Sequence, residues 1–228
     1  RDGIVQSPAS TAAAMGAYLE LRQPERAIEL YRSLPPDSQQ SFGTGVDYFY
    51  ALLESGQYAA AVAWADQMAA RQPMYFNADT PGLRSENPDY VGARVLAAMA
   101  RTCTDRFGDA YQRLQALLEI APANRDAQLA LAETAGMRGW PRHAEQTASR
   151  ALQTSPDAVG PLVRILAAQL QMNEARAAQH TLERIQAALP PDSAVRARAE
   201  RDWRNNNAAE FGIVGQLGRS YGGRQDVI

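Results

Sequence analysis

Residues 122–156 read PANRDAQLALAETAGMRGWPRHAEQTASRALQTSP, and this stretch decides the fold. It begins and ends on proline, and Gly139 divides it into two runs rich in Ala, Leu, Glu, Gln and Arg. Those residue types favour helices, and glycine tolerates the left-handed conformation in which many helices end. Proline cannot continue a helix, so it closes the unit. The stretch therefore predicts two helices joined by a tight turn.

The same pattern recurs along the chain with a constant period. Prolines stand 34 residues apart at Pro88, Pro122, Pro156 and Pro190. Alanine stands twelve residues before Pro73 and before the last three of these prolines, at Ala61, Ala110, Ala144 and Ala178, and Ala27 holds the same place in a shortened first unit. A small residue there lets the second helix cross the first closely. Since 34 residues is the length of a tetratricopeptide repeat (TPR), a pair of antiparallel helices, we predict an all-α, TPR-type solenoid.

Turn residues keep the same register. Seventeen residues before the closing prolines stand residue types that tolerate a left-handed helix end: Gly56, Asp105, Gly139 and Asn173. Helix pairs are predicted over 8–21 and 25–34, 41–55 and 58–71, 90–104 and 107–120, 125–138 and 141–154, and 158–172 and 173–189. A further helix over 192–207 is expected to cap the stack, with Trp203 packed on the last unit. Residues 1–207 thus form a predicted TPR superhelix of about five units plus a capping helix.

Two segments break the helical pattern. Residues 74–88 add about fifteen residues between the second and third units, and their Asn, Pro, Gly and Ser predict an irregular insert. From Glu210 the pattern has a period of two, which is typical of a glycine-rich β-strand. One strand has no sheet to join in a helical stack, so we expect residues 208–228 to be the truncated start of a following β-barrel. The chain begins without methionine, which also suggests a segment of a longer protein.

Composition and motifs argue against several classes of function. The net charge is −2, which does not favour nucleic acid as a partner. Cys103 is the single cysteine, and neither His143 nor His180 has a Cys or His at the spacing of a metal site, so we expect no disulfide, metal or cofactor. Asp126 and Glu133 lie seven residues apart on an open helix face, unlike the paired carboxylates of a glycosidase. We predict a protein that is not an enzyme.

The first helix of each pair is expected to line the inner, concave wall of the solenoid. Counting from each closing proline places six candidate binding residues on that wall: Glu20, Asp47, Tyr50, Glu54, Asp126 and Glu133. The third and fifth units contribute Val95, Met99, Cys103, Val163 and Arg164. The predicted groove is acidic with one aromatic residue, although the whole chain is nearly neutral. Carboxylates accept charge-assisted hydrogen bonds, so such a groove favours a cationic or polyhydroxylated ligand.

The order of these features resembles a known family. An array of TPR units that ends in a tryptophan-bearing helix and continues into a glycine-rich strand is similar to the junction in PgaA-like outer-membrane porins. The segments that carry the likeness are Arg138-Gly139-Trp140-Pro141-Arg142-His143-Ala144-Glu145, Asn87-Pro88-Asp89-Tyr90 after Gly82-Leu83-Arg84, and Gly218-Arg219-Ser220. The resemblance covers residues 43–220, and the insert and the terminal strand contribute most of it.

The resemblance implies a periplasmic domain that precedes its own outer-membrane β-barrel and serves the export of a biofilm exopolysaccharide. Such a domain receives partially de-N-acetylated poly-β-1,6-N-acetyl-D-glucosamine (PNAG), binds the periplasmic PNAG deacetylase and guides the polymer to the pore. Deacetylation exposes amines, which suit an acidic groove. Two alternatives stay open: a TPR scaffold whose groove takes a protein segment, and a cellulose-type secretion protein. Aligned carboxylates would favour the amino sugar, and a row of aromatic residues would favour a neutral glucan. An apolar or strongly polar slot with basic residues that bind a carboxylate would favour a protein tail.

Overall fold

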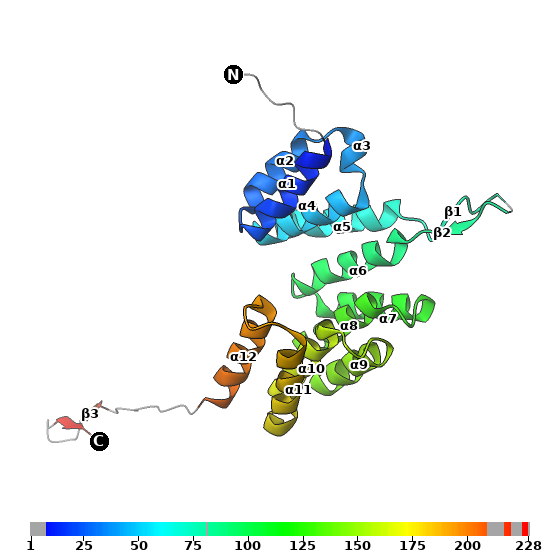
Figure 1. The fold of residues 1–228 in the computed structure, drawn as a ribbon. Coiled ribbons are helices and arrows are strands. Elements are labelled where there is room, and N and C mark those ends of the chain that lie inside the picture. Colours follow the sequence, from blue (N-terminus) through cyan, green and yellow to red (C-terminus); the bar gives the residue numbers. More distant parts are fainter. Residues whose placement is uncertain (1–7, 81, 209–216, 220–224, 228) are drawn as a thin grey trace.

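The computed structural model of the 228-residue chain describes residues 8–80, 82–208, 217–219 and 225–227. Helical hairpins stacked side by side form its body (Figure 1). The hairpins pair α1 (Pro8–Glu20) with α2 (Pro24–Ser33), α4 (Phe42–Glu54) with α5 (Tyr58–Arg71), α6 (Asp89–Thr102) with α7 (Phe107–Ile120), α8 (Arg125–Met137) with α9 (Pro141–Thr154), and α10 (Val159–Gln171) with α11 (Ala175–Ala188). The short α3 (Pro36–Gln39) follows the first hairpin, and α12 (Ala194–Asn207) follows the last. The predicted helices are confirmed, with small shifts at their ends.

Each hairpin turn contains one residue with a left-handed backbone. The φ angles are 57° at Arg22, 75° at Gly56, 59° at Asp105, 79° at Gly139 and 57° at Asn173. Two backbone hydrogen bonds close every turn. In the fourth hairpin, the Gly139 amide donates to Gly136 O over 3.0 Å, and the following amide donates to Ala135 O over 2.9 Å. This Schellman pattern satisfies carbonyls at the helix end, and it confirms the four turns predicted at glycine, aspartate and asparagine.

The alanines that recur with the period are buried where the two helices of each pair cross. Ala27, Ala61, Ala110 and Ala178 are 0% exposed, and Ala144 is 3% exposed. In the fourth pair, a Cβ added at Gly136 would lie 3.8 Å from the Cβ of Ala144. A larger side chain at such a position would force the helices apart. The equivalent burial of all five alanines confirms the repeat predicted from the sequence.

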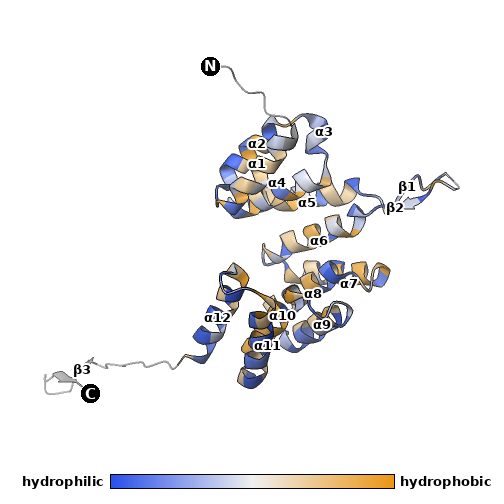
Figure 2. Ribbon diagram, viewed as in Figure 1, coloured by the Kyte–Doolittle hydropathy of each residue, from blue (hydrophilic) through white to orange (hydrophobic). Residues whose placement is uncertain are grey.

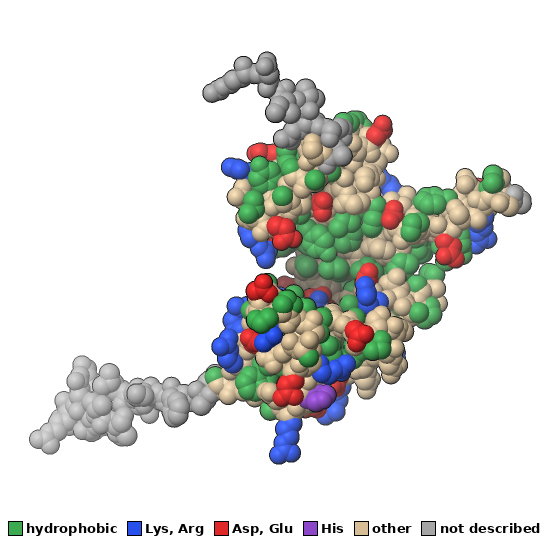
Figure 3. Space-filling model, viewed as in Figure 1, with side chains coloured by type: hydrophobic (Ala, Val, Ile, Leu, Met, Phe, Trp, Pro, Cys, Tyr) green, Lys and Arg blue, Asp and Glu red, His purple; other side chains and the backbone are tan. Residues whose placement is uncertain are grey.

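The stack curves around a hollow. The α1/α2 hairpin and α12 lie on either side of its opening (Figures 1 and 3). Hydropathy differs along the stack, because α6, α8 and α10 are rich in hydrophobic residues whereas α12 is largely hydrophilic (Figure 2). Trp203 on α12 packs against the buried cluster that contains Leu162 and Leu166, which confirms its predicted position. The capping helix thus covers the core of the last hairpin and forms one wall of the hollow.

The insert between α5 and α6 contains a short β-hairpin, which corrects the irregular structure predicted from its composition. β1 (Tyr75–Phe76) pairs antiparallel with β2 (Ser85–Glu86), and this arm projects away from the stack (Figure 1). Asn87 is 5% exposed and holds the base of the arm. Its side-chain amide donates to Gln72 Oε1 and to Pro73 O, both over 2.9 Å. The turn-forming residues of the insert therefore belong to a paired, anchored element.

The predicted terminal strand falls partly within the described residues. β3 (Leu217–Arg219) pairs antiparallel with β4 (Gln225–Val227). A second short strand therefore joins the first, whereas the sequence pattern suggests one strand without a partner. Residues 209–216 and 220–224 of this segment lie outside the described residues. The start of a β-barrel over 208–228 remains a prediction.

Candidate functional site

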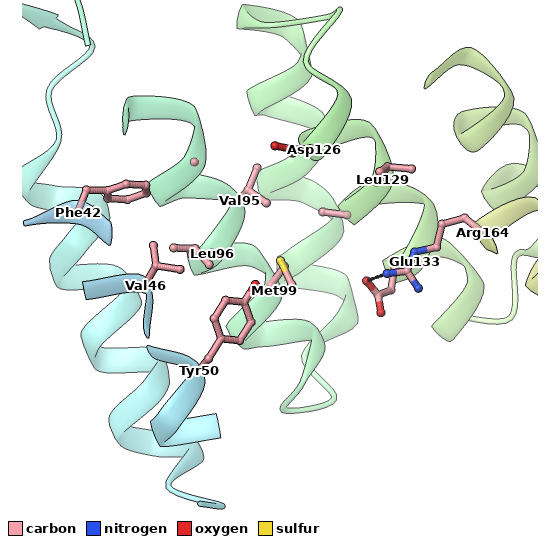
Figure 4. A pocket seen from close by; sticks show the side chains of 12 residues that line it. Phe42, Val46, Tyr50, Val95, Leu96, Met99, Asp126, Leu129, Glu133 and Arg164 are labelled. Carbon is pink, nitrogen blue, oxygen red and sulfur yellow. Dashed lines mark hydrogen bonds and ion pairs between the residues drawn. The ribbon is translucent and has the colours of Figure 1, made fainter. Parts of the chain in front are cut away.

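The middle of the concave groove is a pocket of about 320 Å³ between α4, α6 and α8 (Figure 4). Its wall is mainly apolar and is formed by Phe42, Val46, Val95, Leu96, Met99 and Leu129. These side chains share a face because inner positions recur every three or four residues along a helix. Asp126, Glu133 and Arg164 add charge to the side nearer α10. The pocket therefore offers mostly apolar contact area to a ligand.

The pocket lies where α4 and α6 contact each other less extensively than α6 and α8 do. Near the start of both helices, the Phe42 ring lies against Gly92, where an added Cβ would be 3.2 Å from Phe42 Cζ. Further along, Tyr50 and Met99 face the pocket (Figure 4). The arm at 75–86 is inserted at this same junction. The insertion and the open stretch of the groove thus coincide.

A second pocket, of about 340 Å³, lies at the N-terminal end of the groove between α1 and α4. Tyr50 lines both this pocket and the middle one. The six residues predicted from the sequence are therefore brought together in two connected pockets. The N-terminal pocket contains Glu20, Asp47, Tyr50 and Glu54, and the middle pocket contains Tyr50, Asp126 and Glu133.

Arginines neutralise part of the acidic wall expected from the sequence. Arg22 Nη1 lies 2.9 Å from Glu54 Oε1, and Arg164 Nη2 lies 2.7 Å from Glu133 Oε2. Asp47 has no ion-pair partner among the described residues, and burial raises the pKa of its carboxyl group. The unpaired negative charge is thus concentrated toward the N-terminal end of the groove instead of being spread evenly along it.

Tyr50 lies where the negative charges of the groove converge. Burial raises the pKa of its hydroxyl, and Cys103, Glu133 and Asp126 raise it further. Cys103 is a free cysteine at the end of α6, and desolvation together with Glu133 raises the pKa of its thiol as well. A thiol with a raised pKa stays protonated near neutral pH and is a weak nucleophile. The geometry here suits the binding of a cation better than covalent chemistry.

A third pocket, of about 450 Å³, lies between α8, α10 and α12. It shares Leu129 and Arg164 with the middle pocket. Apolar side chains dominate its wall: Val159, Val163, Leu166, Leu170, Leu189 and Val195. Arg198 and Asp202 of α12 also line it. The three pockets follow one another along the concave wall, from a polar N-terminal end to an apolar C-terminal end.

Solved structures show what this architecture is. A thermophilic TPR protein from Thermus thermophilus has a TM-score of 0.69 at 15% identity, and the match covers 86% of this chain and 98% of that one. A tetratricopeptide repeat protein from Parabacteroides merdae has a TM-score of 0.64 at 13% identity, covering 89% of this chain and 73% of that one. This chain has the TPR fold. At such low identity the likeness shows the fold alone. No protein-family model matches the sequence, and no curated protein matches it either.

Counting inner positions along the TPR array identifies Val163 and Arg164, which line the groove, but not Leu129 or Val195. The signal for Leu129 is Gly160 on the next inner helix, where an added Cβ would lie 3.2 Å from Leu129 Cδ1. Glycine leaves room for a large neighbour, so a glycine on an inner face points to one. Val195 belongs to α12, which has no partner helix and therefore no place in the repeat count.

Within the described part of the chain, the TPR array holds no group of three or more His, Cys, Asp or Glu side chains placed to bind a metal. Among the described helices, none is both long enough and apolar enough to cross a membrane. What the groove offers is apolar area, a half-buried tyrosine and carboxylates at one end. Such a combination suits non-covalent binding of a ligand with both apolar and charged parts.

Proposed function

We propose that this TPR array is a non-catalytic scaffold whose concave groove holds a segment of a partner protein. One observation carries the proposal: the three pockets adjoin along the inner wall, through Tyr50 at one step and through Leu129 and Arg164 at the next. A long groove with an apolar floor suits an extended or helical peptide, which presents side chains at regular spacing. Stacks of helical repeats commonly use such concave surfaces for binding.

The charges and aromatic residues of the groove support a peptide over a polysaccharide along its whole length. Glu54 and Glu133 are ion-paired to arginines of neighbouring hairpins, so they have less to offer to the amines of a sugar polymer. Phe42 and Tyr50 are the aromatic residues that line the pockets described above, and two rings do not form the row on which a neutral glucan stacks. The apolar side chains that line the middle and C-terminal pockets fit a protein segment.

Selection of peptides tests this proposal. Random short peptides displayed on phage are selected on the immobilised chain, and an enriched peptide is titrated by fluorescence anisotropy. Leu129→Gln is expected to weaken its binding by at least about tenfold, since burying a leucine contributes roughly 1.5–3 kcal/mol. Ile120→Gln is the matched control, because Ile120 is 50% exposed on α7 and lines none of the three groove pockets. Enrichment of no peptide, or equal weakening by both variants, would overturn the proposal.

A second candidate function rests on the N-terminal pocket. Glu20, Asp47 and Glu54 line it together with a single arginine, Arg22. Partially de-N-acetylated PNAG carries amines that would match this charge. In this interpretation the array is the periplasmic domain of a PgaA-like exopolysaccharide export porin. Its partners would be the polymer and the periplasmic deacetylase, and the polymer would leave through the β-barrel that follows.

Titration with defined sugar oligomers separates the two candidates. Fully acetylated and partly deacetylated β-1,6-linked N-acetylglucosamine oligomers are titrated into the chain by calorimetry. The second candidate predicts that the deacetylated oligomer alone binds, that the double variant Glu20→Gln, Asp47→Asn loses this binding and that Leu129→Gln keeps it. The first candidate predicts no oligomer binding and loss of the selected peptide in Leu129→Gln.

A further inference from the structure

The groove is negatively charged at one end and nearly neutral at the other. At the α1/α4 end, three carboxylates, those of Glu20, Asp47 and Glu54, face the pocket together with one arginine. At the α10/α12 end, Arg164 and Arg198 line the pocket, but Arg164 is ion-paired with Glu133 and Arg198 Nε lies 3.7 Å from Asp202 Oδ2. A groove concentrates the field of the charges that line it, so a bound charged segment feels this gradient along its length.

Apolar side chains, by contrast, become more frequent toward the C-terminal end of the groove. The C-terminal pocket is walled by aliphatic side chains such as Val163, Leu166 and Leu170, and Val195 of α12 is 47% exposed toward solvent. In the N-terminal pocket, charged side chains replace these aliphatic ones. The groove therefore has an acidic, polar half and an apolar half. They meet at the middle pocket, which takes residues from both sides.

Tyr50 and Asp47 form the part of the N-terminal pocket that fits a basic side chain. Tyr50 is 37% exposed and lines both the N-terminal and the middle pocket. Asp47 is half-buried with no ion-pair partner among the described residues, and an uncompensated carboxylate in such a place is unfavourable. The face of a tyrosine ring attracts cations, and a carboxylate beside it adds a charge-assisted hydrogen bond. A guanidinium or ammonium group would satisfy both residues at once.

We infer that the segment bound in the groove is basic at the end that lies over α1 and α4, where an Arg or Lys side chain sits against Tyr50 and Asp47, and apolar at the end that lies between α10 and α12. The inference rests on the proposed function, because it names the kind of protein segment that the groove takes. The charge gradient and the opposite gradient of apolar area both specify this one arrangement.

Two short fluorescein-labelled peptides test the inference. Each has Leu and Val in one half, and the other half carries Arg in the first peptide and Glu in the second. Both are also made in reverse sequence, since the groove does not fix the direction of the bound chain. At low salt the basic peptide is expected to bind about tenfold more tightly, the effect of two partly exposed charge pairs, and added salt should reduce the difference.

Charge variants of the chain locate the effect. The double variant Glu20→Gln, Asp47→Asn is expected to reduce the preference for the basic peptide to about twofold or less. Both carboxylates of the pocket that have no ion-pair partner among the described residues are then lost, and only Glu54, which is paired with Arg22, remains. The matched control is Glu119→Gln with Asp157→Asn, two exposed carboxylates that line none of the three groove pockets, and it should leave the preference unchanged. Thermal melts of both double variants verify that the fold is retained.

The outcomes separate the inference from the proposed function. Equal affinity for the basic and acidic peptides, with both weakened by Leu129→Gln, would overturn the inference and leave the peptide groove standing. The inference would also be overturned if both double variants showed the same preference for the basic peptide. The carboxylates that select this peptide would then lie elsewhere in the chain. If neither peptide binds while a phage-selected peptide does, the inference fails alone. If no peptide binds and the deacetylated oligomer does, both fail.

Discussion

Two junctions between neighbouring hairpins of this TPR array are built differently. At the regular junction, between α8/α9 and α10/α11, polar contacts tie α10 to both helices of the preceding hairpin. Arg164 Nη2 lies 2.7 Å from Glu133 Oε2, and Gln169 Nε2 donates to Glu145 Oε1 over 2.8 Å. At the junction that contains the arm, between α4/α5 and α6/α7, the inner helices contact each other less. Polar ties there come from Arg101, which donates to Asp66, and from Arg94, which donates to Gln72 O over 3.1 Å.

Arg101 of α6 joins three helices. Its two terminal nitrogens each donate to one carboxylate oxygen of Asp66 on α5 over 2.9 Å, and its Nε donates to Asp109 Oδ2 on α7 over 2.7 Å. The Arg101 side chain is 4% exposed. At this junction the packing of α5 against α6 and the Arg101 network hold the two units together, although their inner helices contact each other less. The inner face that is opened in this way becomes binding surface.

The largest effect is expected from removing Arg101 at the junction that contains the arm. Arg101→Ala leaves Asp66 and Asp109 without their buried partner, and removing one member of a buried ion network costs about 3 kcal/mol of unfolding free energy. Urea denaturation followed by circular dichroism measures this. Arg106→Ala is the control, because Arg106 also bonds to Asp109 but is 55% exposed, and an exposed pair contributes about 1 kcal/mol or less. Equal losses would show that the network does not hold this junction.

Arg101→Ala should also change how the stability of the fold depends on pH. Burial acts to raise the pKa of Asp109, but hydrogen bonds from Arg113 and Arg101 outweigh it and hold the pKa below its ordinary value. A carboxyl group whose pKa is lowered in the folded state stabilises that state above its ordinary pKa, and this stability is lost as the pH falls through the lowered pKa. Arg101→Ala should therefore make the acid-induced loss of stability shallower.

The anchor of the arm is the next point at which the two junctions can be compared. Asn87→Ala removes three hydrogen bonds of a buried side chain, those that it donates to Gln72 Oε1 and Pro73 O and the one that it accepts from the Asp89 amide, which should cost about 2 kcal/mol. Asn124 is the counterpart at a regular junction, where its side chain accepts from the Ala127 amide and caps α8. Asn124→Ala should cost about 1 kcal/mol. Hydrogen exchange should also speed up in residues 75–86 of the first variant alone, and unchanged exchange there would contradict the anchoring role.

The repeat can be predicted from the sequence because every hairpin needs the same few residue types. Left-handed turn positions select glycine, asparagine or aspartate, and helix crossings select alanine, so Gly139 and Ala144 have counterparts in register. The left-handed position at Arg22 could not be predicted in this way, because arginine is not one of the residue types that prefer this conformation. The arm also escapes prediction, because its strands are two residues long and follow no period.

The binding groove is harder to predict because its charge depends on contacts between units. Arg22 and Glu54 are 32 residues apart in sequence, and Arg164 and Glu133 are 31 apart. Counting inner positions within each helix finds the carboxylates and Arg164, but it does not find Arg22, which lies in a hairpin turn, and it does not show that each arginine pairs with a glutamate of the neighbouring unit. Both pairs lie close to one period apart, so comparing charges at that distance would predict them. The opening between α4 and α6 has no such signal, since it depends on how two helices diverge.

Each of the two junctions has a glycine in close contact with a side chain of the neighbouring inner helix. A Cβ at Gly92 would lie 3.2 Å from the Phe42 ring, and a Cβ at Gly160 would lie 3.2 Å from a terminal methyl group of Leu129. Alanine is favoured over glycine by about 0.5–1 kcal/mol in a helix interior and by less in the first turn, where Gly160 lies. Because Leu129 can rotate away, Gly160→Ala should be neutral or slightly stabilising. The planar Phe42 ring adjusts less easily, so Gly92→Ala should be destabilising by about 1 kcal/mol. Equal effects in thermal melts would mean that the contact between Phe42 and Gly92 is as adaptable as its counterpart.

The smallest effect concerns Asp47, the half-buried carboxylate of the N-terminal pocket. Burial raises the pKa of Asp47 above its ordinary value of 3.8, so its ionised form disfavours the folded state at neutral pH. Asp47→Asn should therefore stabilise the protein at about pH 7, by about 0.5 kcal/mol or less because the carboxylate remains partly in solvent. The gain should vanish at about pH 3, below both the folded and the unfolded pKa, where the wild-type side chain is neutral as well. A gain that persists at low pH would have another source, and Asp157→Asn supplies the exposed control. Because the same change should weaken binding of the basic peptide, stability and binding are expected to move in opposite directions, as they do when a carboxylate is retained for its ligand.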